Sequence, residues 1–362
     1  MITTTVFPGR YVQGDQAFTQ LGAELARFGK RGLSILAPSA HRNLLDELQA
    51  QSATVHLEWE LFNRECCEPE IERLTARAKA GRCEFIAGIG GGKTIDTSKI
   101  VADRLGIPVA VVPTIASTDA PCSSCAVVYT EGGEVVSSLY QRKNPNLVLV
   151  DTGIIARAPV RFLVSGMGDA LATRFEAESC RQSLANNEAG VKGSLTGYAL
   201  AQLCYDTLIE YGLAAKISCE AQAVTPALEH VVEANTLLSG LGFESGGLAA
   251  AHSIHNGLTV LAPTHGYYHG EKVAIGVLAS LFLTDRPKAL IAEVYGFCES
   301  VGLPTTLAAI GLAGVSREDL RRVADRACAE DEFIHHEPME VSPDSVVAAL
   351  LAADGEGRRR KG

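Results

Sequence analysis

Phe85-Ile-Ala-Gly-Ile-Gly-Gly-Gly-Lys-Thr-Ile-Asp-Thr-Ser-Lys99 joins an apolar run to a segment with helical spacing. Phe85–Ile89 has the composition of a buried strand, and Ile95–Leu105 is predicted to be a helix. The glycines between them let the backbone approach an anion, and the helix N-terminus supplies free amide groups and a favourable dipole. This pattern is typical of a phosphate site in an α/β domain. A tight turn that binds nothing is the alternative.

Two standard nucleotide-binding fingerprints fit the stretch only in part. The pattern GxGxxG fails because its third glycine, counted from Gly88, is Lys93. The Walker A pattern fails by one residue, since Ala87 stands where its first glycine belongs. An apolar strand ending in an acid, Leu147-Val-Leu-Val-Asp151, resembles a Walker B strand. A P-loop nucleotide hydrolase therefore remains an alternative.

The first 150 residues alternate short β-rich runs with helical stretches, which predicts an α/β layer with a largely parallel sheet. The predicted strands are Leu33–Leu36, Val55–Trp59, Phe85–Ile89, Val109–Val112, Ala126–Tyr129 and Leu147–Val150. Glu70–Ala80 is a further predicted helix, and Glu131–Glu134 is a predicted hairpin turn, because its glycines can adopt positive φ.

After about residue 160, long Ala- and Leu-rich segments with 3.6-residue apolar spacing predict an all-helical region. Thr225, Ser316 and Ser342 are predicted helix caps. We predict a dinucleotide-binding α/β domain over residues 1–158 and a helical metal- and substrate-binding domain over residues 159–362.

Composition excludes several classes of protein. Of the 362 residues, 47% are apolar and 20% are charged, which is a globular composition, and the net charge of −10 disfavours nucleic acid. The basic cluster Arg358–Lys361 is predicted to be a solvated, frayed tail. Val273–Thr284 is too short to span a membrane, no secretory leader is visible, and the ten cysteines are expected to be reduced. We expect a cytoplasmic protein without a nucleic-acid or membrane partner.

Four of the nine histidines, His252, His255, His265 and His269, fall within eighteen residues. His252 and His255 share a helix face, and His269 is expected to open the next helix. Together with a carboxylate, such imidazoles could bind a divalent metal. Asp169 is the candidate carboxylate, placed near a helix start, where helix-dipole complementarity is its alternative role.

Five motifs resemble those of the glycerol dehydrogenases, the zinc-dependent polyol branch of the iron-containing alcohol dehydrogenase superfamily. They are Gly90–Lys99, Pro113–Cys122, Gly168–Thr173, Glu244–Gly257 and His269–Val273. The resemblance implies an α/β nucleotide-binding domain followed by an all-α domain, the dehydroquinate synthase-like fold. It also implies a homo-oligomer, an octamer by family likeness.

The same resemblance assigns site residues. Asp169, His252 and His269 would bind the metal, which we expect to be Zn²⁺, with Fe²⁺ as the alternative. Asp119 would contact a substrate hydroxyl, and His255 would relay a proton, orient substrate or support a ligand by a hydrogen bond.

The implied cofactor is NAD. Its pyrophosphate would meet Gly90, Gly91, Gly92 and Lys93, and the rest of its groove would contain Thr114, Ser117, Ser123, Cys125 and Tyr129. Two positions depart from the family: an acid that touches the adenosine ribose is Ala37 here, and a leucine is Cys125. Because the missing acid normally repels a 2′-phosphate, we expect NADP to be accepted as well.

The predicted activity is the reversible oxidation of glycerol, or a similar vicinal diol, to dihydroxyacetone or the corresponding hydroxyketone. The metal would lower the pKa of the substrate hydroxyl, and hydride would pass to the nicotinamide. A hydroxy acid or glycerol phosphate dehydrogenase on the same fold is the alternative.

Overall fold

The chain forms two units in a computed structural model that describes residues 2–362. The α/β unit contains Phe7–Pro159 and Ser218–Gly240, and the helical unit contains the N-terminal residues to Val6, Val160–Ile217 and Leu241–Gly362. The division at Pro159 falls next to the predicted boundary. Ser218–Gly240, however, groups with the α/β unit instead of the helical one, so a single cut does not describe the chain.

A six-stranded parallel sheet forms the centre of the α/β unit, with strand order β1-β8-β5-β4-β2-β3. Its strands are β1 (Tyr11–Gly14), β2 (Arg31–Leu36), β3 (His56–Leu61), β4 (Phe85–Gly90), β5 (Val109–Pro113) and β8 (Leu147–Asp151). The strands β6 (Cys125–Tyr129) and β7 (Val135–Tyr140) form a separate antiparallel hairpin. All six predicted strands are confirmed. Because β4, β5 and β8 are buried along their whole length, they appear in sequence as continuous apolar runs.

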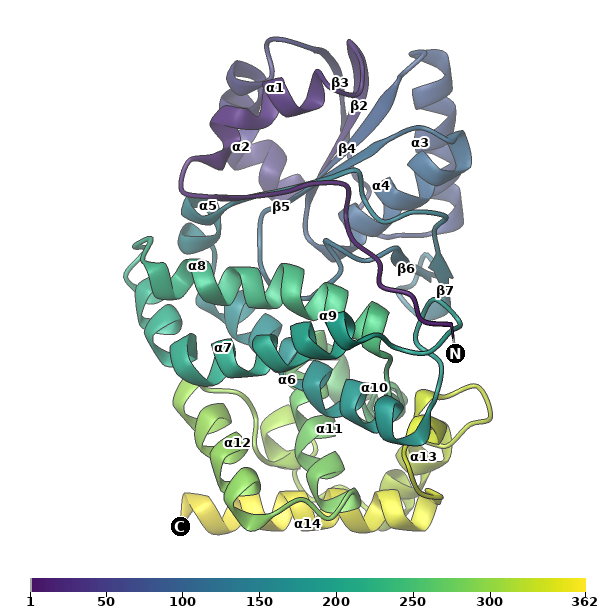
Figure 1. Ribbon diagram of the computed structural model, residues 1–362, viewed down its shortest axis with the longest axis vertical. Coiled ribbons are helices and arrows are strands. Elements are labelled where there is room, and N and C mark those ends of the chain that lie inside the picture. Colours follow the sequence, from purple (N-terminus) through teal and green to yellow (C-terminus); the bar gives the residue numbers. More distant parts are fainter. Residues whose placement is uncertain (1) are drawn as a thin grey trace. The chain divides into compact units, whose positions relative to one another are not determined.

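Helices cover both faces of this sheet. The helical segments of this unit are η1 (Ala17–Gln20), α1 (Leu21–Leu25), α2 (Pro38–Gln51), α3 (Glu68–Ala80), α4 (Gly92–Leu105), α5 (Thr152–Arg157), α8 (Pro226–Glu233) and the π-helical turn η2 (Ala234–Leu238). In Figure 1, α1 and α2 lie on one side of the strands, and α3 and α4 lie on the other. The sequence did not predict α2, because only Ala40 and Leu48 of its fourteen residues are buried.

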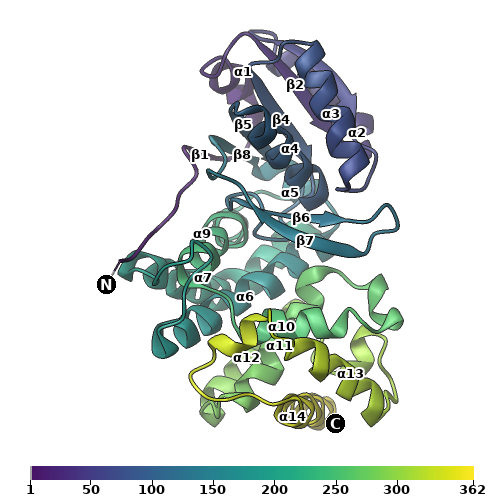
Figure 2. The ribbon, with the colours of Figure 1, turned by 90° about the vertical axis from the view of Figure 1, so that its right-hand side faces the viewer.

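The helical unit confirms the predicted change of character after residue 160. Its elements are α6 (Val160–Ser183), α7 (Leu195–Glu220), α9 (Ser239–Gly246), α10 (Ala250–Leu258), η3 (Ala262–Gly266), α11 (His269–Leu283), α12 (Lys288–Val301), η4 (Leu307–Ile310), α13 (Arg317–Ala327), η5 (Phe333–His336) and α14 (Pro343–Lys361). Figure 2 shows α10 and α11 side by side, and both pack against further helices of this unit. Thr225, Ser316 and Ser342 cap α8, α13 and α14 as predicted.

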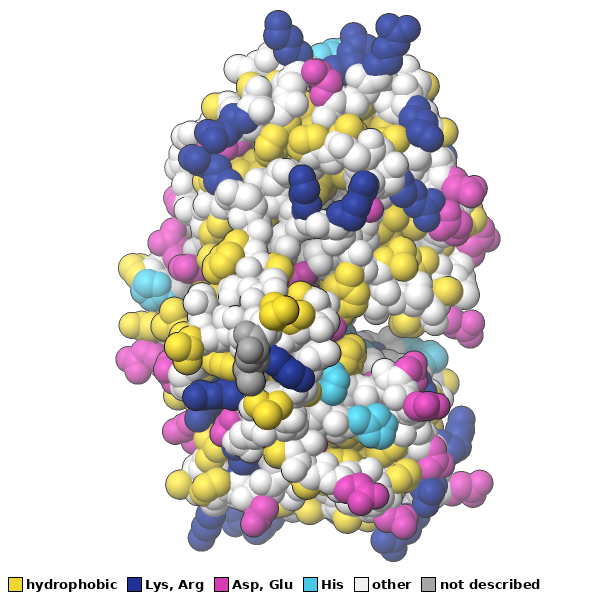
Figure 3. Space-filling model, turned by 45° about the vertical axis from the view of Figure 1, so that its right-hand side comes forward, with side chains coloured by type: hydrophobic (Ala, Val, Ile, Leu, Met, Phe, Trp, Pro, Cys, Tyr) yellow, Lys and Arg dark blue, Asp and Glu magenta, His cyan; other side chains and the backbone are white. Residues whose placement is uncertain are grey.

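The basic C-terminal cluster is not a frayed tail, which corrects the sequence prediction. Helix α14 continues to Lys361, and Arg360 binds Glu299 of α12 at 2.7 Å. Arg358 and Arg359 pair with acids one turn earlier on the same helix. On the face drawn in Figure 3, basic and acidic side chains are interspersed.

No helix within residues 2–362 is both long enough and apolar enough to cross a membrane.

Candidate metal centre and cofactor site

Three side chains of the helical unit converge as a metal-type donor set. Asp169 Oδ1 lies 3.3 Å from His252 Nε2 and 3.1 Å from His269 Nε2. Ligands about 2.0–2.1 Å from a tetrahedral zinc ion lie roughly 3.3–3.4 Å from one another. One carboxylate and two imidazoles at these separations therefore fit a divalent metal with three protein ligands. His265 does not join them, since it is exposed and contacts the carbonyl of Thr259.

The sequence prediction placed Asp169 near a helix start, and this prediction is wrong. Asp169 lies in the middle of the 24-residue α6 and is 1% exposed, so helix-dipole complementarity does not explain it. Its neighbour Gly168 and the residue after His269, Gly270, allow α6 and α11 to touch. A Cβ on either glycine would collide with the backbone of the other helix. The close approach of the two helices brings carboxylate and imidazole together.

Glu176, to which the sequence analysis gave no role, fixes His252. Its Oε2 lies 2.6 Å from His252 Nδ1, which leaves Nε2 directed towards Asp169. Its Oε1 accepts hydrogen bonds from the backbone amides of Ala249 and His252 at the start of α10. Glu176 therefore caps the helix and sets the ring orientation of the ligand that the helix carries.

A second hydrogen-bonded series begins at His269. The Nδ1 of His269 lies 3.0 Å from His255 Nε2, and His255 Nδ1 lies 3.1 Å from Asn256 Oδ1. The Asn256 amide donates to Glu332, which pairs with Arg326 at 2.6 Å. If His269 binds a metal through Nε2, it donates through Nδ1, and each later group then has one donor facing one acceptor.

Opposing effects set the protonation of the cluster. Burial alone would raise the pKa of Asp169, but the charge of His269 and hydrogen bonds from both ligand histidines outweigh it and lower that pKa. Burial would lower the pKa of His252, but Glu176 and Asp169 raise it well above its usual value. Burial, followed by the charges of His269 and Lys272, lowers the pKa of His255. His255 is therefore neutral and can accept a hydrogen bond from His269.

The α/β unit places the glycine stretch as predicted, between the end of β4 and the start of α4. The amide of Thr114 donates to the carbonyl of Gly90, which places the end of β5 beside this turn. A Cβ on Gly90 would lie 2.6 Å from the Cβ of Ala37 and 2.9 Å from Thr94 Oγ1. Glycine is needed there because Ala37, directly after β2, and Thr94, in the first turn of α4, leave no room for a side chain.

The remaining predicted cofactor residues lie on the loop after β5 and on β6. Lys93 pairs with Glu65 at 2.6 Å and lies 4.4 Å from the centre of the Tyr129 ring. Ser117 and Ser123 are in the loop, and Cys125 opens β6.

Two charged residues of α4 that the sequence analysis did not single out organise this loop. Lys99 is 2% exposed, and its ammonium donates to the carbonyls of Ala120, Ser123 and Cys125. Asp96 pairs with Lys99 at 3.0 Å and accepts from the amide of Val127. Because Asp96 and Lys99 are three residues apart on one helix, they share a helix face, and this spacing could have indicated their ion pair.

Two acids of this unit have structural partners. Asp119 is half-buried, and its Oδ2 accepts a hydrogen bond from Ser239 at 2.8 Å. Asp151, the acid of the strand that resembles Walker B, caps α5 and accepts from the amides of Ile154 and Phe18. This buried capping role accounts for the acid without a Walker B function.

Comparison with known proteins gives the same class as the fold and the donor set. The family of iron-containing alcohol dehydrogenases matches residues 8–152, and a Thermotoga maritima protein is 61% identical over 362 residues, 100% of this chain and 99% of that relative. The chain belongs to the iron-containing alcohol dehydrogenase family. Membership of this family implies a nicotinamide cofactor and a metal ion.

Within the family, several full-length relatives of this chain are glycerol dehydrogenases. The Thermotoga maritima relative is a glycerol dehydrogenase, and so is a protein from Escherichia coli O6:H1 that is 48% identical and covers 97% of this chain and 96% of its own. The crystal structure of a probable glycerol dehydrogenase from Sinorhizobium meliloti superposes with a TM-score of 0.94 at 44% identity, covering 99% of this chain and 100% of the other.

Proposed function

We propose that this protein reversibly oxidises glycerol, or a similar vicinal diol, to dihydroxyacetone or the matching hydroxyketone, with NAD as hydride acceptor. The observation that carries the proposal is the donor set of Asp169, His252 and His269, two imidazoles and one carboxylate at zinc-type separations. The full-length similarity to glycerol dehydrogenases supports the choice of substrate.

The resident metal in this proposal is Zn²⁺. It would be held by the three donors, and it supplies Lewis acidity that lowers the pKa of a substrate hydroxyl. Glu176 keeps His252 in the tautomer with a free Nε2 lone pair, and His255 does the same for His269. Metal binding would replace the protons that the three donors share.

The nicotinamide cofactor supplies the hydride acceptor, and this chain's part is to bind and orient it. The amides at the start of α4, together with Gly90, Gly91, Gly92 and Lys93, would hold the pyrophosphate. In that step Lys93 would exchange Glu65 for a phosphate oxygen. Thr114, Ser117, Ser123, Cys125 and Tyr129 would line the groove, and Asp119 would accept a hydrogen bond from a substrate hydroxyl.

One assay tests the function directly. Purified protein is stripped with a chelator, reloaded with Zn²⁺, Fe²⁺ or Mn²⁺, and assayed for reduced nicotinamide with glycerol, 1,2-propanediol, 1,3-propanediol and ethanol. We expect one metal per chain, highest activity with Zn²⁺, and preference for the vicinal diols, because adjacent hydroxyls can both reach one metal. Full activity after complete metal removal would contradict the proposal.

A second candidate, oxidation of a hydroxy acid or glycerol phosphate, is favoured by one residue. Lys272 lies three residues after His269 on α11 and is 8% exposed. Its charge is among those that act on His255, so a cation lies near the donor set. Adding lactate and glycerol 3-phosphate to the panel decides between the candidates. Faster turnover of either anion, lost in Lys272→Met, would favour this second function.

We also propose a cytoplasmic homo-oligomer, an octamer by likeness to the family. The ten cysteines are free thiols, as in a reducing compartment. Helix α7 exposes Leu195, Leu203, Leu213 and Ile217, and such apolar side chains are typical of subunit contacts. Light scattering coupled to gel filtration measures the oligomeric state.

A further inference from the structure

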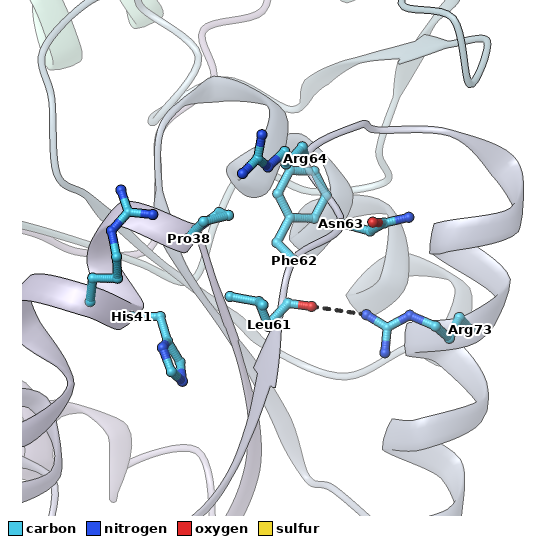
Figure 4. A pocket seen from close by; sticks show the side chains of 8 residues that line it. Pro38, His41, Leu61, Phe62, Asn63, Arg64 and Arg73 are labelled. Carbon is cyan, nitrogen blue, oxygen red and sulfur yellow. Dashed lines mark hydrogen bonds between the residues drawn. The ribbon is translucent and has the colours of Figure 1, made fainter.

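A pocket of about 490 Å³ opens in the α/β unit at the carboxyl ends of β2 and β3. Its wall includes Pro38, His41 and Arg42 from α2, Phe62 and Arg64 from the loop after β3, and Arg73 from α3. Figure 4 shows these side chains arranged around the opening, with Pro38 between His41 and Arg64 in this view. No Asp or Glu lines the pocket, so apart from Asn63 its lining is apolar or basic.

The pocket and the glycine turn both lie at the carboxyl ends of the parallel strands. Strands β2 and β4 are paired neighbours, and Ala37, directly after β2, donates its amide to the carbonyl of Ile89. The amide of Phe62, directly after β3, in turn donates to the carbonyl of Leu36. The glycine turn after β4 and the pocket after β2 and β3 therefore lie next to one another along the carboxyl ends of the strands.

Two of the pocket cations lack a counter-charge. Arg73 is neutralised, since it pairs with Glu60 at 2.9 Å and Glu70 at 2.7 Å. Arg42 and Arg64 are exposed, and neither forms an ion pair within residues 2–362. An anion that enters the pocket could therefore bind both guanidinium groups without displacing a carboxylate.

Helix α2 adds to this preference for an anion. Its N-cap is Ala37, whose side chain offers no oxygen to the free amides, and its first turn contains no acid. By contrast, α3 begins with Glu68 and Glu70 in its first turn. The uncompensated N-terminus of α2 therefore presents its partial positive charge at the pocket.

We propose that this pocket binds the phosphate on the 2′-oxygen of an adenosine ribose, so that the protein uses NADP(H) as well as NAD(H). The inference rests on the proposed function, because it requires the pyrophosphate to bind at the glycine turn. A dinucleotide held there extends its adenosine ribose to the neighbouring strand end. At that strand end stands Ala37, which cannot repel a phosphate, and the arginines beyond it attract one.

The closing experiment uses cofactor fragments, so that binding is read without turnover. Calorimetry on the full-length protein compares 2′,5′-ADP with 5′-AMP, and inorganic phosphate is titrated separately. We expect 2′,5′-ADP to bind at least about tenfold more tightly than 5′-AMP, with an advantage that falls as salt rises. Arg42→Ala and Arg64→Ala should each reduce that advantage roughly tenfold.

Arg82→Ala is the matched control. Arg82 and Arg64 are both exposed, and both have positive φ, 51° and 71° respectively. Arg82, however, precedes β4 and therefore lies at the amino end of that strand, away from the pocket at the carboxyl ends. Its replacement should leave the advantage of 2′,5′-ADP unchanged. Ala37→Asp should weaken 2′,5′-ADP selectively, because it introduces a like charge beside the phosphate.

A kinetic arm completes the test. With saturating glycerol, NADP should support kcat/KM within about a hundredfold of NAD, and Ala37→Asp should widen that gap. Equal affinity for 2′,5′-ADP and 5′-AMP in a protein that oxidises glycerol with NAD would overturn the inference and leave the proposed function intact. Arginine-dependent binding of inorganic phosphate without that advantage would identify a free anion site and overturn it too. Absence of NAD binding and of glycerol oxidation would instead refute the proposed function, and the inference with it.

Discussion

At the scale of single residues, His252 contacts Asp169 with one ring nitrogen and Glu176 with the other. We predict that His252→Ala lowers zinc affinity more than about a hundredfold and abolishes diol oxidation, because two ligands cannot retain the ion. Metal content after dialysis against a chelator measures the effect. His265→Ala, an exposed histidine outside the cluster, is the control. Stoichiometric metal and a near-normal rate in His252→Ala would show that the assignment is wrong.

Asp119 can be tested separately from the metal. Asp119→Asn keeps the side-chain shape but removes a charge-assisted acceptor, worth about 1.5–3 kcal/mol, so glycerol turnover should fall roughly tenfold to a hundredfold. Ser239→Ala removes the observed hydrogen bond to Asp119 while keeping the carboxylate, and it should have the smaller effect. Unchanged kinetics in a folded Asp119→Asn protein would leave Asp119 with a structural role in its loop.

At the scale of elements, Glu176 links α6 to α10. In Glu176→Gln the amide oxygen can still accept from the backbone of Ala249 and His252, but an amide nitrogen would face the Nδ1 of His252. We predict that the helix cap persists while zinc affinity falls about ten- to a hundredfold. Competition with a zinc-binding dye gives the affinity, and thermal unfolding reports the cap.

The control for this variant lies on the same helix. Glu178→Gln alters a half-buried acid that pairs with Arg286 at 3.0 Å and is not part of the donor set. It should leave zinc affinity unchanged. If both variants lose zinc equally, the effect comes from α6 as a whole and not from the orientation of His252.

At the scale of the whole molecule, the metal and the cofactor should stabilise different units. A ligand at about a hundredfold above its Kd adds roughly 2.7 kcal/mol to the stability of the state that binds it. We predict that zinc increases amide-exchange protection in α6, α10 and α11, and that NAD does so at β4 and α4. Hydrogen exchange with each ligand alone measures both effects. Equal protection of both sets of elements by zinc alone would contradict this assignment.

Local sequence patterns alone determined much of this protein. The apolar runs placed six strands, and the hydroxyl residues Thr225, Ser316 and Ser342 placed three helix starts. The glycine turn could be recognised because its glycines are consecutive in the sequence and stand between an apolar run and a helical segment. Asp169, His252 and His269 were predicted as a set from donor type and family resemblance, and the structure brings them together.

The tertiary structure alone decided how these pieces act, because the decisive contacts join residues far apart in sequence. Asp169 lies in the middle of α6, where Gly168 and Gly270 permit close contact between α6 and α11. Glu176 and Glu332 gained their roles from the helix ends and side chains they meet, which no local pattern encodes. The basic pocket likewise exists only because a parallel sheet aligns the ends of β2 and β3. Periodicity reports which face of an element is buried, whereas the identity of its partner depends on packing across the chain.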